Sequence, residues 1–321
     1  MASFGDLNRV NTNIQSLDSQ LSLNKINKQM AENQLKMSTG KRINRAEDDS
    51  AGFSIATKLR SRIGGLNQAM QNVGDAKSVL NIAESSFGSI MDNLVEMKGL
   101  ATQAANDTLG DDERAFIGDQ LKALGDDINN IADQTVYQDY SLLSGDNNDD
   151  DTAIKTGSTT LTFQVGERTS DIIEAELNAV NVATLFADDP TAADNTLGTA
   201  GGNISVSAAT ADKGGELDFA AAGTANSADY RAFITEVDDA ITKMSENVND
   251  IGITQSSLSV REQTLSESIS ANESAKSRIV DTDFAKAQSE SVRLQILQQT
   301  ATSSLAQANN GPQSVLGFIG G

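Results

Sequence analysis

Residues 59–104 read LRSRIGGLNQAMQNVGDAKSVLNIAESSFGSIMDNLVEMKGLATQA, and apolar side chains recur in them every seven residues. A repeat of seven that continues over this length places a narrow apolar seam along an α-helix, and such a seam needs a partner helix. The first row of this seam consists of Leu59, Leu66, Val73, Leu80, Phe87 and Leu94, and a parallel row three residues further on begins at Ala69 and Ala76.

A second seam with the same period lies near the other end of the chain. Only two prolines, Pro190 and Pro312, occur in 321 residues, so long helices meet few breaks. We expect the two seams to pair, which gives a mainly α fold: a folded-back rod of long N- and C-terminal helices in coiled-coil bundles, with a small β excursion in the middle. The second seam consists of Val237, Met244, Ile251, Leu258, Leu265 and, after Asn272, Ile279.

Two polar residues, Lys28 and Asn272, interrupt otherwise apolar rows. One interpretation makes them register keys, since a single polar residue in a seam selects one helix alignment over slipped ones. The alternative is that the seam frays or rotates at these positions. For Asn272 we favour the key, because Leu265 and Ile279 flank it.

Shorter elements are expected between these seams. Residues 7–38 predict an amphipathic helix that ends at Thr39–Gly40, and another helix runs from about 50 to 105. Alternation in 160–165 predicts a strand within a hairpin near 158–187. Residues 188–226 are poor in core-forming residues and predict a short, variable, exposed tip. Helix 111–135 is expected to bury Phe116, Ile117, Leu121, Leu124, Ile128 and Ile131.

The outermost segments, 1–40 and 284–319, have less regular apolar rows. They lack the apolar surface to fold alone, and we expect them to order on association. The last helix should end at 309–312, where Asn-Asn-Gly-Pro occurs. The candidate assembly residues on these segments are Ile14, Leu17, Leu21, Leu35, Leu294, Leu297 and Leu305.

Composition argues against several classes of function. The chain has no Cys and no His, which removes thiolate nucleophiles, imidazole acid–base chemistry and most zinc or copper sites. We therefore expect neither an enzyme nor a cofactor or metal site. The net charge of −21 disfavours nucleic acid as a partner. No apolar run long enough to span a membrane occurs, and the N-terminus has no secretory signal pattern.

Several longer motifs resemble those of bacterial flagellins, the subunits of flagellar filaments. The most specific is STGKRINRAEDDSAGFSIA at 38–56; VNTNI at 10–14, SRIVDTDFA at 277–285 and QILQQ at 295–299 extend the match. The resemblance covers about 1–145 and 228–321. The apolar, glycine-rich ending at 317–321 departs from the family's usual finish, so the last contacts of the chain are outside what the resemblance supports.

The resemblance implies a domain organisation and a function. Residues 1–44 and 280–321 would form an inner coiled-coil domain, 45–187 and 227–279 a helical rod domain, and 188–226 the tip. The chain would self-assemble into the extracellular filament that bacteria rotate to swim, after export without a cleaved signal peptide. Its partners would be other copies, the flagellar export apparatus, an export chaperone, the filament cap and hook-junction proteins. A hook–filament junction protein is the alternative, since it shares the terminal helices.

Overall fold

The computed structural model describes residues 12–145, 157–187, 195–196, 204–209, 214–219 and 225–319, with side chains for all of these except 195–196 and 311–319. Two compact units are present: residues 1–64 with 269–321, and residues 65–268. The expected mainly helical fold, with long helices toward both ends and a small central strand region, is confirmed. Its helices are α1 (Ile14–Thr39), α2 (Ser50–Ala104), α3 (Asp111–Gln134), α4 (Val182–Phe186), α5 (Ser227–Val280) and α6 (Phe284–Ile319).

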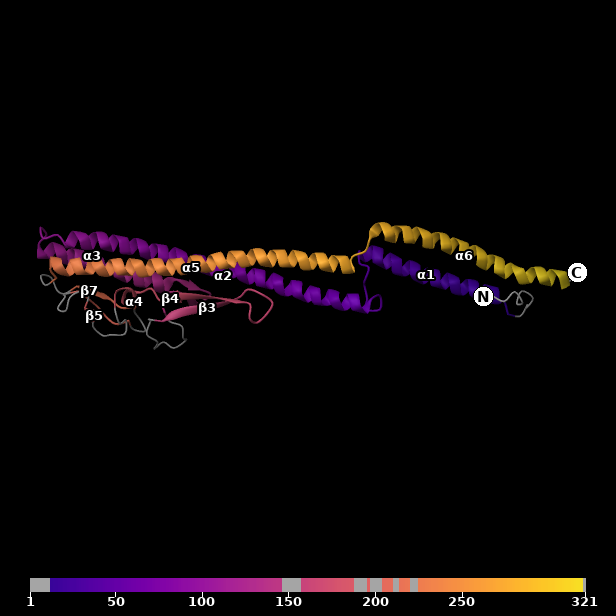
Figure 1. The fold of residues 1–321 in the computed structure, drawn as a ribbon, viewed down its shortest axis with the longest axis horizontal. Helices are drawn as coiled ribbons and strands as arrows, with labels where there is room; N and C mark the ends of the chain where they lie inside the picture. Colours follow the sequence, from indigo (N-terminus) through magenta and orange to yellow (C-terminus); the bar gives the residue numbers. More distant parts are fainter. Residues whose placement is uncertain are drawn as a thin grey trace. The chain divides into compact units, whose positions relative to one another are not determined.

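The first unit contains α1 and α6 lying antiparallel along each other (Figure 1). Gly40 ends α1 in the left-handed conformation at φ 70°, as the Thr39–Gly40 stop predicts. The prediction that α6 ends at 309–312 was wrong, because the helix continues through Pro312 to Ile319. In general, a proline can occupy a helix at the cost of one backbone hydrogen bond, because its fixed φ angle is helical.

The second unit is built on α2, α3 and α5. Their seam side chains are almost fully buried, from Leu66 to Ala104 on α2 and from Tyr230 to Leu265 on α5. Polar side chains tie the two long helices in antiparallel register: Lys77 pairs with Glu262 at 2.8 Å and Lys98 pairs with Asp238. The heptad repeat therefore has the partner that it requires.

The end of α2 and the start of α3 are joined by buried arginine contacts. Arg114 is 8% exposed, and its guanidinium donates to the carbonyl oxygens of Ala104 (3.2 Å) and Asn106 (3.1 Å). The last carbonyls of a helix have no partner within the helix, so a cation placed there satisfies them and favours the helix dipole. Arg231 does the same for Ala105 at 3.2 Å.

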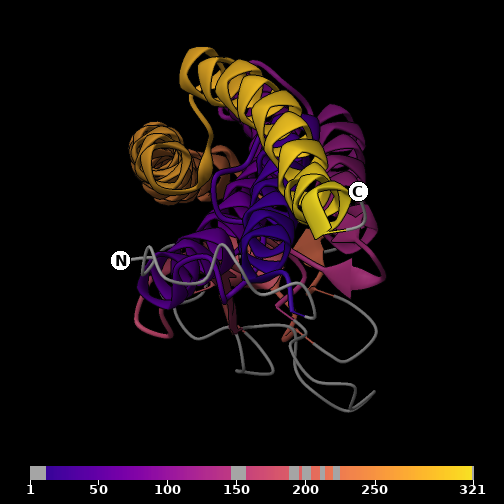
Figure 2. The same ribbon diagram turned by 90° about the vertical axis from the view of Figure 1, so that its right-hand side faces the viewer.

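Short strands lie beside the helices of this unit, below them in Figure 1 and again in the turned view of Figure 2. They form a hairpin β1–β2, a second hairpin β3–β4 inside the expected range 158–187, and a three-stranded antiparallel sheet in the order β5–β6–β7. Their bounds are β1 Val136–Tyr137, β2 Tyr140–Ser141, β3 Ser158–Gln164, β4 Ile172–Asn178, β5 Asn195–Thr196, β6 Ile204–Val206 and β7 Leu217–Phe219.

The described part of 188–226 is not the exposed segment that its composition predicts. Ile204, Val206 and Leu217 are at most 1% exposed. Sheet and α3 approach closely because α3 carries Gly118 and Gly125: a Cβ at these positions would lie 3.3 Å from Phe219 and 3.0 Å from Leu217. Two glycines one heptad apart thus make a smooth face for β7. Most of the remaining residues of the predicted tip lie outside the described ranges.

One residue of the predicted α3 stripe also lies elsewhere. Ile117, Leu121 and Ile128 are buried, but Phe116 is 68% exposed. Adjacent residues on a helix point about 100° apart, so Phe116 and Ile117 cannot both face the same neighbour. The side with Gly118 and Leu121 is the one that packs.

Candidate assembly surface

The α1–α6 pair uses a seam that alternates three- and four-residue steps on both helices. On α1 the inward positions include Leu23, Ile26, Met30 and Met37, all half-buried, and the buried Asn33. On α6 they are Ala287, Ser291, Leu294, Gln298, Ala301, Leu305 and Ala308. Small and polar residues fill much of this seam, so the pair buries little apolar surface for its length.

A stronger set of apolar side chains is left uncovered on the same two helices. On α1, Leu17, Leu21 and Leu35 are 51%, 66% and 39% exposed. On α6 the corresponding side chains are Val292, Ile296 and Leu297, which are 46%, 58% and 38% exposed. By helical spacing, Leu17, Leu21 and Leu35 share the side of α1 that faces away from the seam, and Val292 and Ile296 share the corresponding side of α6. Large apolar side chains that line up along a helix in this way mark an interaction surface rather than ordinary surface scatter.

The predicted assembly residues therefore divide into two groups. Leu294 is 1% exposed in the seam, and Ile14 and Leu305 are half-buried. Leu17, Leu21, Leu35 and Leu297 are exposed outside the seam. The structure therefore buries the first group at least in part within one chain and leaves the second group exposed.

Polar contacts fix how α1 and α6 align. The Asn33 side chain, 9% exposed, donates from Nδ2 to the carbonyl oxygen of Ala287 at 2.8 Å. Near the other end of the pair, Asn13 Nδ2 donates to the carbonyl oxygen of Ala308 at 2.8 Å. The Asn13 Oδ1 also accepts from the backbone N–H of Ser16, which caps the start of α1.

Of the two interpretations of Lys28, the structure favours an interruption of the seam over a register key, because the Lys28 side chain is 81% exposed and faces Glu32 at 3.9 Å. Asn272 is half-buried, and its role as a key stays a prediction. Asn33 is the polar residue in the α1 seam. A signal for it was present: Asn33 lies seven residues after Ile26 and between Met30 and Met37, within an apolar pattern.

The connection from α1 to α2 crosses the connection from α5 to α6, and the two are joined by hydrogen bonds. The N–H of Thr282 donates to the carbonyl oxygen of Gly40 at 2.9 Å, and Lys41 and Asp281 form an isolated antiparallel bridge. Arg42 extends this by donating from its side chain to the carbonyl oxygen of Ile279 at 2.7 Å. This crossing anchors the neighbouring ends of α1 and α6.

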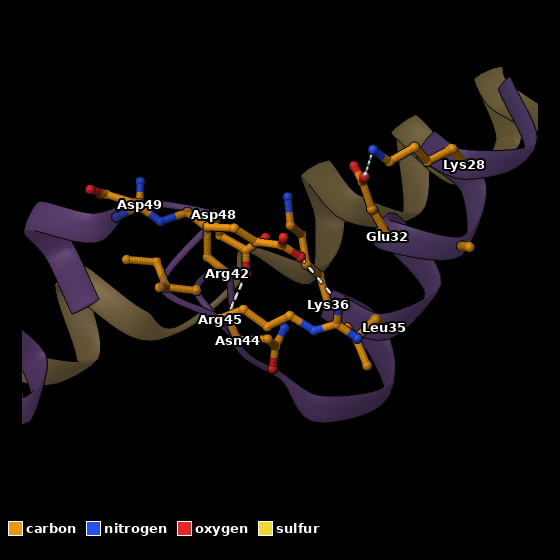
Figure 3. A pocket seen from close by; sticks show the side chains of 12 residues that line it. Lys28, Glu32, Leu35, Lys36, Arg42, Asn44, Arg45, Asp48 and Asp49 are labelled. Carbon is orange, nitrogen blue, oxygen red and sulfur yellow. Dashed lines mark hydrogen bonds and ion pairs between the residues drawn. The ribbon is translucent and has the colours of Figure 1, made fainter. Parts of the chain in front are cut away.

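A depression of about 790 Å³ lies beside the crossing, between the later turns of α1 and the turn that precedes α2 (Figure 3). Its basic and acidic side chains are equally numerous. Asp48 accepts from the N–H groups of Arg45 and Asn44, both at 2.9 Å, which lowers the pKa of its carboxyl group below 3.8. The charged lining residues are Lys28, Glu32, Lys36, Arg42, Arg45, Glu47, Asp48 and Asp49.

This depression is a structured, solvated turn. Asp49 caps the start of α2, since its side chain accepts from the N–H of Gly52 at 2.9 Å, and Asp48 closes the turn that precedes it. Among the described residues, no three acidic side chains are grouped so that they could hold a metal ion. None of the described helices is long and apolar enough to cross a membrane.

The predicted rod-seam residues lie in α2 and α5. Leu59 and Ile279 are half-buried and belong to the first unit. The other ten are at most 6% exposed and belong to the second: Leu66, Val73, Leu80, Phe87, Leu94, Val237, Met244, Ile251, Leu258 and Leu265.

Known proteins share this organisation. The N-terminal helical region of bacterial flagellin matches residues 10–148, and the C-terminal helical region matches 234–319. A flagellin of Bacillus subtilis (strain 168) is 33% identical over 97% of this chain and 99% of its own length. A flagellin of Listeria innocua is 30% identical over the same shares.

A solved structure supports the fold. A putative flagellar hook-associated protein from Vibrio parahaemolyticus aligns with 73% of this chain and 100% of its own, with a TM-score of 0.56 and 16% identity. At that identity the likeness concerns the fold alone. The two terminal matches together cover more than half of the sequence and coincide with the paired long helices, and the chain therefore belongs to the bacterial flagellin family.

Proposed function

We propose that this chain is the structural subunit of a bacterial flagellar filament, a helical extracellular polymer that is rotated as a propeller. The observation that carries the proposal is the set of uncovered apolar side chains on the outer sides of the α1–α6 pair, with Leu17 and Leu21 on one helix and Ile296 on the other. Family membership supplies the kind of polymer, and these outer sides supply the surfaces that other copies would cover.

Covering these outer sides is favourable enough to drive association. Burying the exposed half of a leucine or isoleucine side chain contributes roughly 1 kcal/mol. Several such side chains per copy repeat along the polymer. If the contact joins different patches on successive copies and its rotation does not close, the result is an open helical polymer.

The remaining partners and domain roles are part of the same proposal. Residues 1–44 and 280–321 form the inner coiled-coil domain, 45–187 and 227–279 the rod domain, and 188–226 a short tip whose strand β7 packs on α3 of the rod domain. The seam of α1 and α6 is poor in apolar contacts, which supports terminal segments that order only on assembly. Such a chain suits export in an unfolded state through the flagellar export apparatus with a chaperone, followed by addition beneath a filament cap next to hook-junction proteins.

Electron microscopy of the purified chain tests this function. We expect long helical filaments from the full chain, and soluble helical monomers from chains lacking residues 1–40 or 284–321. Short rings or no polymer from the full chain would favour a hook–filament junction protein instead. Filaments from either truncated chain would refute the role given to that terminus.

A further inference from the structure

The second unit contains an apolar pocket of about 300 Å³ that its own core leaves unfilled. It is built from three elements: α2, the β1–β2 hairpin and the strand β3. The lining residues of this hairpin pocket are Val79, Tyr137, Gln138, Tyr140, Leu142, Leu161 and Phe163. Tyr140 is 50% exposed at the pocket, and Ile82, one turn beyond Val79 on α2, is 40% exposed.

The turn that forms one side of the pocket has an unfavourable backbone. Gln138 and Asp139 both have positive φ, 48° and 65°, a conformation that residues other than glycine rarely adopt. Two positive φ values in a two-residue loop give the hairpin its tight turn, and they set Tyr137 directly opposite Tyr140. The turn therefore holds Tyr137 and Tyr140 in fixed positions at the pocket.

The pocket is also uncharged within a strongly acidic unit. Residues 65–268 contain 35 Asp and Glu against 10 Lys and Arg, so copies of this unit repel one another over most of their surface. The segments that contain the lining residues of α2, β2 and β3, namely 78–83, 140–145 and 157–166, contain no charged residue, and Asp139 is the one acid in the hairpin turn. A second copy can approach here without that repulsion.

A projecting apolar surface with the same lack of charge lies on α5. Residues 251–260 contain no charged side chain. Ile253 and Val260, one heptad apart, are 58% and 65% exposed, whereas Ile251 and Leu258 are at most 2% exposed. At two positions beyond each buried residue, Ile253 and Val260 point away from the core. We call this pair the α5 ridge.

We propose that in the filament the hairpin pocket of one copy receives the α5 ridge of a second copy. The two surfaces differ, so the contact is heterologous and can continue from copy to copy without closing. Each surface is an apolar patch in an acidic unit. The hairpin pocket is concave and the α5 ridge projects, so their shapes are complementary. This inference rests on the proposed function and names a contact within that filament.

Single-cysteine chains test the contact directly, because the natural sequence has no cysteine. Tyr140→Cys chains are copolymerised with Val260→Cys chains, and in a second mixture with Ile253→Cys chains, and treated with a short bismaleimide. A variant that polymerises poorly is diluted into unsubstituted chains. We expect covalent dimers in at least one mixture and none from filaments of either variant alone. In the matched control, Tyr140→Cys chains are copolymerised with Val95→Cys chains. Val95 lies on α2 and is 57% exposed, and it belongs to neither proposed surface.

The outcomes separate this contact from the proposed function. Filaments that give no mixed dimer with either ridge variant, or as much dimer with the Val95→Cys control, would overturn the contact while leaving the filament function standing. A full chain that forms no filament would refute the function, and the contact with it. As a second readout, Val260→Glu should raise the critical concentration for polymerisation at least tenfold, and Val95→Glu should leave it nearly unchanged.

Discussion

The substitution Gly118→Ala tests how the central strands pack on α3. An added Cβ would lie 3.2 Å from Tyr230 Oη and 3.3 Å from Phe219 Cβ. Neither neighbour can easily move: the Tyr230 hydroxyl donates to the carbonyl oxygen of Arg114 at 3.0 Å, and the Phe219 ring lies 5.6 Å from that of Phe233. Forcing one more carbon into such a site typically costs 1–3 kcal/mol, and we take about 2 kcal/mol.

Gly74→Ala is the matched control, because a Cβ at position 74 meets no heavy atom within 4 Å. Replacing a helical glycine by alanine stabilises the helix by about 1 kcal/mol at either site. Gly74→Ala should therefore stabilise the chain by about 1 kcal/mol. For Gly118→Ala the same gain is outweighed by the contact, and the chain should lose about 1 kcal/mol.

Thermal unfolding followed by far-ultraviolet circular dichroism measures the difference. A change of 1 kcal/mol shifts the Tm of a domain of about 200 residues by roughly 2–4 °C. We expect the Tm to rise for Gly74→Ala and to fall for Gly118→Ala. An equal rise for both variants would refute the packing of β7 against Gly118.

Three further substitutions probe other contacts. Arg114→Met should lower the free energy of unfolding, measured in urea, by about 2–3 kcal/mol, because the last carbonyls of α2 lose a charged donor; an unchanged value would contradict this role. Asn33→Leu should raise the Tm of the assembled filament, in which α1 and α6 are ordered, since burying its carboxamide costs more than one hydrogen bond to the α6 backbone offsets; a lower filament Tm would contradict that balance. Hydrogen bonds from Ser227 and Arg231 lower the pKa of Asp107 below 3.8, so its contribution is present above the unfolded pKa and lost as the pH falls through the folded value. Urea denaturation of Asp107→Asn across pH 2–6 should show a weaker acid dependence, and an identical pH profile would exclude that contribution.

The sequence predicts the long helices well because their pattern is periodic and local. The seam from Leu66 to Leu94 repeats a single step, so both the helix and its buried side follow from the residues alone. The end of α1 at Gly40 is equally local, because a glycine at the end of a helical pattern readily adopts the left-handed backbone conformation that ends a helix.

The packing of the central strands could not be predicted in the same way. Gly118 and Gly125 interrupt a helical pattern, and from sequence alone they lower helix propensity. Their role is to let β7, which lies about 100 residues further along the chain, pack closely against α3, and this role is visible only in the folded structure. The burial of Ile204 and Leu217 likewise could not be predicted from composition, because it depends on tertiary contacts.

The assembly face was predicted only in part. Sequence groups Leu17, Leu21 and Leu294 as one set of apolar residues on weak seams. Which of two competing apolar rows faces the neighbouring helix depends on how α1 and α6 rotate against each other. The seam with Asn33 and the small residues of α6 allows the closer approach, which leaves Leu21 outside.

The most direct measurement of the central claim is the maleimide reactivity of Leu21→Cys in the monomer and in the filament, with the variant diluted into unsubstituted chains. Leu21 is 66% exposed in the single chain. If copies cover this side of α1, Cys at 21 reacts rapidly in the monomer and at least tenfold more slowly in the filament, whereas Asp218→Cys, at an exposed position of β7, reacts at the same rate in both. Equal reactivity at position 21 in monomer and filament would contradict the account.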